Sequence, residues 1–334
     1  MLLLLVVAGL LLYTIYNRYE DNRQQPEIDT VERVHYEAFN IELPEEFYFC
    51  SEPVPLNEPD VRERLDQQLH KNVFFHSSTF LIMKRANRWL PQITAVMEQY
   101  GVPDDLKYLA IIESALTNVV SPAGATGFWQ IMPTTGREFG LQINNEVDER
   151  YDPIKATHVA CRYFLQAYKK FGNWTLAAAS YNRGMAGVER ALTRQRVQSF
   201  YDLKLNSETA HYVFRAMAIK EIVENPQKYR YELSSRHLYH PEETRTVEVS
   251  SSVPDLVEFA IQQGINYKIL KMYNPWLRSD RLTVRNGQIW QIKVPARVTE
   301  EMLTTDDGLQ PIPETDSLSA DTTRTKEAGA ELVL

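Results

Sequence analysis

A glutamate on the apolar stripe of an amphipathic segment is the feature that most constrains this chain. The stretch from Tyr108 to Pro133 reads YLAIIESALTNVVSPAGATGFWQIMP. Apolar residues stand at three- and four-residue spacings around Glu113, namely Leu106, Leu109, Ala110 and Leu116. This spacing predicts a helix that turns the Glu113 carboxyl toward the core. Because burial disfavours a charge, we expect the pKa of Glu113 to be raised, so that the carboxyl can donate a proton near neutral pH.

Spacing leaves an alternative open, namely an ordinary helix acid that is exposed or paired with a lysine or arginine. The order of the later segments favours the first interpretation. After Glu113-Ser114 the chain carries GFWQIMP at 127–133, AASYNRG at 178–184 and ETAHYV at 208–213. In this order the segments resemble the four motifs of the lytic murein transglycosylases, the lysozyme-like glycoside hydrolase family 23, and within it the membrane-bound D type. The resemblance extends from Asp60 to Tyr229.

The resemblance implies a fold and a set of site residues. The fold would be mainly α, with a lysozyme-like all-helical catalytic domain followed by a small βααβ LysM-like module. Glu113 would be the catalytic residue. The residues that would bind substrate are Ser114, Gln130, Tyr181, Asn182, Glu208 and Tyr212. The chain departs from the family where Asn206 and Ser207 replace a usual proline, and where Ser180 replaces an alanine before the tyrosine.

Two aromatic residues of these motifs allow two interpretations each. Trp129 either lines the cleft or packs beneath it. Tyr181 either faces the acid, as the resemblance implies, or is a buried tyrosine whose hydroxyl has an internal partner.

The number of acids bears on the reaction. Hydrolytic glycosidases generally use two carboxylates, as the retaining enzyme lysozyme does. One glutamate suffices if the substrate supplies the nucleophile. The resemblance implies that Glu113 protonates the oxygen between N-acetylmuramic acid and N-acetylglucosamine in peptidoglycan, and then deprotonates the muramic 6-hydroxyl. The product would be a 1,6-anhydromuramic end, and the enzyme a peptidoglycan lytic transglycosylase.

Two alternatives of other classes stay open. A goose-type lysozyme-like hydrolase would use a second carboxylate, for which Asp148, Glu149 and Asp152 are candidates. A noncatalytic wall-binding protein would keep affinity for sugar without creating chain ends.

The composition limits the classes of molecule that this chain can bind. The net charge of −8 and the pI of about 5.5 argue against nucleic acid and against an anionic lipid surface as the main partner. Glycan binding would therefore rest on aromatic and hydrogen-bonding contacts. The two cysteines, Cys50 and Cys161, form neither a metal pattern nor a disulfide framework, and we expect buried free thiols. Gly124 and Gly127 lack the lysine and the preceding strand of a nucleotide loop, which argues against a nucleotide site. No cofactor and no metal is expected.

The expected domain organisation has five parts. Residues 1–19 form a membrane anchor or signal segment, because Leu2 to Tyr16 is an almost unbroken apolar run. Residues 20–58 are a proline-dotted acidic tether, and residues 298–334 a disordered tail. Between them lie the transglycosylase domain at 59–230 and the LysM-like module at 240–297. This order predicts a periplasmic or other extracytoplasmic location in the cell envelope, with anchoring to the inner membrane.

Local patterns predict the helices of the domain. A short helix contains Val61, Leu65 and Leu69, and Pro91 is expected to divide or kink the helical pattern from Phe80 to Tyr100. Later helices are predicted from Asp152-Pro153 to Gly172, from Trp174 to Tyr181 and from Ser207 to Glu224.

The last patterned segment resembles a LysM-type glycan-binding module. It alternates as strand, helix, helix, strand, at Thr246–Ser250, Val253–Gly264, Asn266–Leu277 and Ile289–Val294. The usual Gly-Asp-Thr opening is replaced by Ser251 to Pro254. Both glycan binding and a purely structural role are therefore open for this module.

Overall fold

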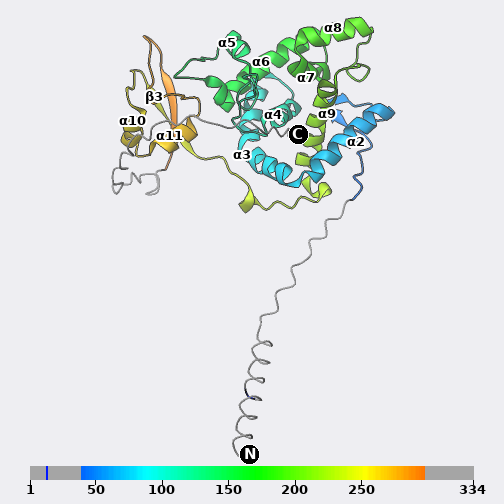
Figure 1. The fold of residues 1–334 in the computed structure, drawn as a ribbon, viewed down its shortest axis with the longest axis horizontal. Coiled ribbons are helices and arrows are strands. Elements are labelled where there is room, and N and C mark those ends of the chain that lie inside the picture. The colour runs from blue at the N-terminus through cyan, green and yellow to red at the C-terminus, as the bar shows by residue number, and fades with distance from the viewer. Residues whose placement is uncertain (1–12, 14–38, 298–334) are drawn as a thin grey trace, which may run out of the picture. The chain divides into compact units, whose positions relative to one another are not determined.

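The computed structural model describes residue 13 and residues 39–297 (Figure 1). The expected anchor at 1–19, apart from Tyr13, the first part of the tether and the tail at 298–334 lie outside the described residues. Among the residues that are described, no helix has both the length and the apolar character needed to cross a membrane.

The first part of the described chain is helical, apart from a short hairpin of β1 (Tyr48–Phe49) and β2 (Glu52–Pro53). Its α-helices are α2 (Pro59–Phe74), α3 (His76–Tyr100), α4 (Lys107–Ser114), α5 (Pro133–Glu138), α6 (Pro153–Phe171), α7 (Trp174–Arg183), α8 (Met185–Gln195) and α9 (Ser207–Glu224). Short 3-10 turns accompany them: η1 (Asp104–Leu106), η2 (Glu149–Tyr151), η3 (Pro226–Tyr229) and η4 (Ser235–His237).

The short helix α4 lies against the long helices of this domain. It packs on α3 and α9, while α9 also contacts α2 and α7, and α6 packs on α3 and α7 (Figure 1). Small side chains allow this close packing, since Ala110 of α4 and the run Ala177–Ala179 of α7 are all fully buried. Helix α4 thereby lies close against α3 and α9.

Helix ends largely follow the sequence signals. The side chain of Asp152 accepts hydrogen bonds from the backbone N–H groups of Ile154 and Lys155 and so caps α6, which ends at Gly172 in the left-handed conformation. Pro91, in contrast, does not divide the chain into two helices, because α3 runs through it from His76 to Tyr100.

The prediction that apolar residues share one helix face with the glutamate is correct only up to Glu113. The helix ends at Ser114, and Ala115 and Leu116 both adopt positive φ angles, of 51° and 56°. Leu116 is nevertheless buried, at 2% exposure. It reaches the core through this turn and not through the helical register that its spacing predicts.

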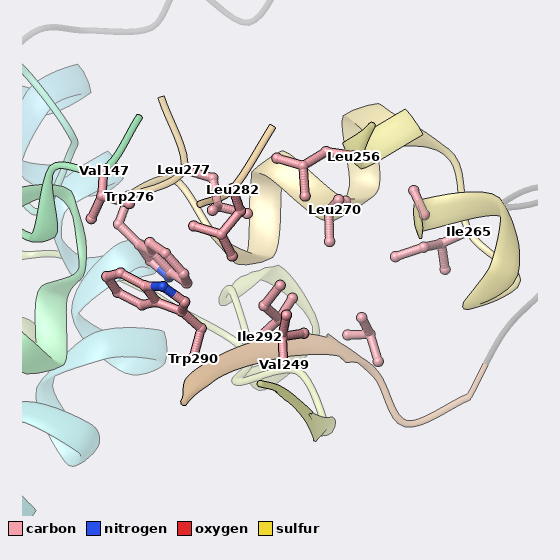
Figure 2. Packing of buried hydrophobic residues seen from close by; sticks show 12 residues of the cluster. Val147, Val249, Leu256, Ile265, Leu270, Trp276, Leu277, Leu282, Trp290 and Ile292 are labelled. Carbon is pink, nitrogen blue, oxygen red and sulfur yellow. The ribbon is translucent and has the colours of Figure 1, made fainter. Parts of the chain in front are cut away.

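The second part of the chain has the predicted order of strand, helix, helix, strand. Its elements are β3 (Thr244–Val249), α10 (Leu256–Gln262), α11 (Tyr267–Tyr273) and β4 (Trp290–Pro295). The strands β3 and β4 pair antiparallel, with Val247 opposite Ile292. Leu256, Leu270 and Ile292 lie at the centre of its own apolar core (Figure 2). The fold class is therefore confirmed: a mainly helical domain is followed by a small βααβ module.

Backbone hydrogen bonds attach the module to the helical domain. The backbone N–H of Asp148 donates to the carbonyl of Trp276 at 2.9 Å, and that of Arg278 donates to the carbonyl of Glu146 at 2.7 Å. Val147, which lies between these two positions of the helical domain, belongs to the core cluster of the module (Figure 2). The segment from 144 to 148 thus contributes directly to the packing of the module.

Candidate active site

Glu113 lies in the last turn of α4 and is partly buried. Burial raises the pKa of its carboxyl above the usual range. A hydrogen bond from Tyr212 and the positive charge of Arg215 oppose this rise, and the negative charge of Glu208 adds to it. The structure thus gives Glu113 the environment of a carboxyl that holds its proton at higher pH than an exposed glutamate does.

Tyr212 of α9 is the direct partner of this carboxyl. Its hydroxyl donates a hydrogen bond to Oε1 of Glu113 at 2.5 Å, and the residue is 2% exposed. Burial, together with the charge of Glu113, holds the pKa of Tyr212 well above its usual value. Tyr212 therefore stays protonated and remains a donor to Glu113.

Tyr181 of α7 lies near the same carboxyl, but its hydroxyl bonds elsewhere. Burial, followed by the charge of Glu113, raises the pKa of Tyr181 well above its usual value. Its hydroxyl donates to the backbone carbonyl of Trp129 at 2.7 Å. The hydroxyl of Tyr181 thus has the internal partner that one of the two interpretations predicted, and it holds the loop that follows α4.

Asn182 and Glu208 join the end of α7 to the first turn of α9. The amide nitrogen of Asn182 donates to Oε1 of Glu208 at 2.9 Å, and its amide oxygen accepts from the hydroxyl of Thr209 at 2.8 Å. Glu208 is exposed, whereas Thr209 is buried. This pair brings a second carboxylate into the surroundings of Glu113, and Thr209 is a member that sequence reasoning missed.

Ser114 and Gln130 both hold the loop between α4 and α5. The buried hydroxyl of Ser114 donates to the carbonyl of Phe128 at 2.9 Å and to that of Ala110 at 3.1 Å. The amide nitrogen of Gln130 donates to the carbonyls of Gly127 and Val119, at 2.9 and 3.1 Å. These contacts give both residues a structural role in the loop.

Trp129 belongs to the core. It is fully buried, and its indole N–H donates to the hydroxyl of Thr157 on α6 at 2.8 Å. Of the two interpretations left open by the sequence, the structure therefore supports packing beneath the loop. The neighbouring Phe128 is also buried and meets Trp89 of α3 edge to face, with ring centres 5.1 Å apart.

A buried arginine that sequence reasoning missed clamps the same loop. The guanidinium of Arg150 donates to the carbonyl of Gly124 at 2.8 Å and to that of Ile131 at 3.0 Å, and it forms an ion pair with Asp148 at 2.7 Å. Its own backbone also shapes the loop, since a Cβ on Gly127 would lie 2.1 Å from the carbonyl oxygen of Arg150. The motif glycine at 127 is thus explained by the close approach of two backbones.

The three candidates for a second catalytic carboxylate are engaged in holding the fold. Asp148 pairs with Arg150, and Asp152 caps α6. Glu149 pairs with Lys155 and accepts a hydrogen bond from the backbone N–H of Gln142 at 2.7 Å.

Arg215 is a further residue of the site that sequence reasoning missed. It lies one turn beyond Tyr212 on α9, with its guanidinium carbon 5.7 Å from the centre of the Tyr212 ring. Its Nε atom is buried and has no hydrogen-bond partner in the described part of the chain. The spacing of three residues from Tyr212 was the available signal, because it places both side chains on one helix face.

Fold and site together define a helical domain in which a partly buried glutamate accepts a hydrogen bond from a buried tyrosine, joined to a βααβ module. Residues 92–203 match the Transglycosylase SLT domain, and residues 245–298 match the Soluble lytic transglycosylase C-terminal LysM-like domain. The chain therefore carries an SLT domain, as the motif order predicted, and a C-terminal LysM-like domain, as the order of strand, helix, helix, strand predicted.

The chain is homologous to the membrane-bound lytic murein transglycosylase D of Escherichia coli. The two are 29% identical over 251 residues, which cover 72% of this chain and 53% of the relative. The same values hold for that protein in a second Escherichia coli strain. The chain thus spans about half the length of the curated relatives it matches.

Two solved structures are also similar. One is the 70 kDa soluble lytic transglycosylase of Escherichia coli, 23% identical, with a TM-score of 0.34, covering 44% of this chain and 26% of the other. The second is an inactive mutant of the lytic transglycosylase Slt from Pseudomonas aeruginosa, 22% identical, with a TM-score of 0.35, covering 46% and 26%.

Proposed function

We propose that this chain is a lytic transglycosylase that cleaves the β-1,4 bond between N-acetylmuramic acid and N-acetylglucosamine in peptidoglycan and leaves 1,6-anhydromuramic ends. The observation that carries the proposal is the Glu113 carboxyl, which burial keeps protonated to higher pH and which Tyr212 holds at 2.5 Å. The SLT domain match and the name of the Escherichia coli relative support the substrate class.

Glu113 acts first as an acid and then as a base in this proposal. Its proton passes to the glycosidic oxygen, the bond to C1 of the muramic sugar breaks, and the N-acetyl group of the sugar stabilises the cationic ring. The Glu113 carboxylate then takes the proton of the 6-hydroxyl, whose oxygen attacks C1 and closes the anhydro ring. The proton returns to Glu113, and no water is consumed.

Digestion of purified sacculi tests the proposal. Soluble muropeptides released by the full chain are weighed by mass spectrometry, and the anhydro form is expected. Glu113→Gln removes the proton donor but keeps an acceptor for the Tyr212 hydroxyl, so it is expected to abolish release while sacculus binding persists.

Glu224→Gln is the matched control. Glu224 is also a glutamate with a raised pKa, caused chiefly by burial, and it accepts a hydrogen bond from a buried tyrosine, Tyr108. The Glu224→Gln variant is expected to release fragments as the wild type does.

Three results would contradict the proposal in different ways. Fragments heavier by one water would indicate a goose-type hydrolase. Binding without new chain ends would indicate a noncatalytic wall-binding protein. Unchanged release by Glu113→Gln would remove Glu113 from the mechanism.

We also propose that the protein works in the cell envelope, outside the cytoplasm, anchored to the inner membrane by residues 1–19. The apolar run from Leu2 to Tyr16 and the membrane-bound character in the name of the relative support this location. Fractionation of cells that express the full chain or a chain lacking residues 1–19 tests it. Recovery of both chains in the same soluble fraction would contradict the anchor.

A further inference from the structure

A groove lies between the helical domain and the LysM-like module. It has a volume of about 640 Å³ and is lined on one side by residues of 137–147 and on the other by residues of 283–290. This volume lies within the range of about 300–1,000 Å³ that ligand pockets usually have. Neither part of the chain forms the groove alone.

The lining of this groove is rich in groups that can bind sugar amides and carboxylates. Its side chains include two guanidinium groups and four carboxamides: Arg137, Arg285, Gln142, Asn144, Asn145 and Gln288. Glu146 is the acid in the lining, and the backbone N–H and the hydroxyl of Thr283 and the Nε of Arg281 all donate to its carboxylate. In a chain with a net charge of −8, the groove thus presents a local excess of positive charge.

A buried donor without an acceptor lies in the same lining. Trp290 is 4% exposed, and its indole N–H has no hydrogen-bond partner in the described part of the chain. Such a group costs free energy until an acceptor reaches it. Figure 2 shows Trp290 stacked on Trp276 beside Val147. The two ring centres lie 5.0 Å apart. The ring therefore belongs to the junction of the two domains.

We propose that this groove is a second binding site for the peptidoglycan strand, shared between the two domains. The carboxylates of the peptide stems pair with Arg137 and Arg285, and the N-acetyl carbonyls accept from the carboxamides. The proposal rests on the proposed function, because that function supplies the substrate class. In this proposal the LysM-like module contributes to binding only when it is packed against the helical domain.

Binding by the full chain tests the proposal, with Glu113→Gln as the parent so that strands are not cut. Calorimetry measures Kd for soluble uncrosslinked peptidoglycan strands that carry peptide stems, and for the neutral N-acetylglucosamine hexamer. Arg137→Ala combined with Arg285→Ala is expected to raise Kd for the strands about tenfold, because the double variant loses the binding free energy of two exposed ion pairs. The same double variant is expected to leave Kd for the hexamer within about twofold.

Arg190→Ala combined with Arg194→Ala is the matched control. Both residues are exposed on α8, outside the groove, so this variant removes the same charge elsewhere. It is expected to bind strands like the parent. A second variant, Gln288→Ala, is expected to weaken the binding of the strands and of the hexamer alike.

Equal Kd values for the groove variant and the parent would overturn the proposal, and so would an equal loss in the control variant, which would indicate nonspecific electrostatics. These results are separate from a failure of the proposed function. That failure would appear as an absence of released muropeptides from the wild-type chain, whatever the groove variants bind.

Discussion

The hydroxyl of Tyr212 donates a 2.5 Å hydrogen bond to Oε1 of Glu113 and so joins α9 to the last turn of α4. The two residues are far apart in sequence, and each is held by its own helix. The bond orients the carboxyl and favours its ionised form, while burial favours the protonated form. The acid is thereby fixed in one direction without losing its raised pKa.

Removing this hydroxyl with Tyr212→Phe should therefore slow the reaction. Loss of orientation is expected to lower kcat about tenfold to a hundredfold. Because the lost hydrogen bond had lowered the pKa of Glu113, the alkaline limb of the pH–rate profile should also move to higher pH. Steady-state kinetics on soluble strands at several pH values measure both effects.

Tyr108→Phe is the control for that change, because Tyr108 makes a hydrogen bond of the same kind to Glu224, at 2.9 Å. Its kcat and its pH–rate profile should match the wild type. An identical decrease in both variants would mean that general destabilisation, and not the orientation of Glu113, is the cause.

Arg215 should set the position of the alkaline limb without touching the bond that is cleaved. Its positive charge lowers the pKa of Glu113, against the opposing charge of Glu208. Arg215→Met is thus expected to raise the pKa of Glu113 and to move the alkaline limb to higher pH, whereas Arg215→Lys should keep it in place. The pH dependence of kcat/KM checks this, with Arg194→Met on α8 as the charge control. A limb that moves to lower pH in Arg215→Met would refute the assignment.

Glu113→Gln should change stability in a pH-dependent direction. The pKa of Glu113 is raised in the folded state, so its contribution to stability is fully present below the unfolded-state pKa and is lost as pH rises through the folded-state value. The amide of the variant cannot ionise and avoids this loss. The Tm of the variant minus that of the wild type should therefore increase from pH 4 to pH 8. A gain of about 1 kcal/mol in the free energy of unfolding corresponds to a rise in Tm of about 2–4 °C. Calorimetric melting curves at both pH values measure it, and a difference that shrinks with pH would contradict the raised pKa.

Much of the helical frame could be predicted because its signals are local. Asp152 caps α6 through its own neighbours in sequence, and Gly172 ends the helix by adopting positive φ. The glutamate on an apolar stripe was likewise visible, because Glu113 shares its helix face with Leu109 and Ala110. The order of strand, helix, helix, strand in the module followed from equally local patterns.

The parts that could not be predicted depend on tertiary contacts. The turn at Ala115 and Leu116 has no glycine to announce its positive φ angles. The clamp of Arg150 on the carbonyls of Gly124 and Ile131 joins segments that only the fold brings together. The spacing of Arg215 from Tyr212 places both on one helix face, but the effect of Arg215 on Glu113 acts between two helices and follows only from the fold.

The loop after α4 allows a matched pair of glycine variants, because Gly124 and Gly127 have nearly equal φ angles, of 85° and 82°, in different surroundings. At Gly124 a Cβ would meet nothing within 4 Å, so Gly124→Ala should cost only the backbone strain of about 1–2 kcal/mol. At Gly127 the Cβ would meet the backbone oxygen of Arg150 at 2.1 Å.

Gly127→Ala should therefore destabilise the protein by more than Gly124→Ala, by about 3 kcal/mol or more, because a backbone carbonyl cannot rotate away as a side chain can. Urea unfolding of both variants measures the difference. The clash would also displace the loop, in which Gln130 donates to the carbonyl of Gly127, so the release of muropeptides from sacculi should fall further in Gly127→Ala. Equal stabilities would show that the loop and Arg150 can separate at little cost, and the clamp would then have no part in shaping the site.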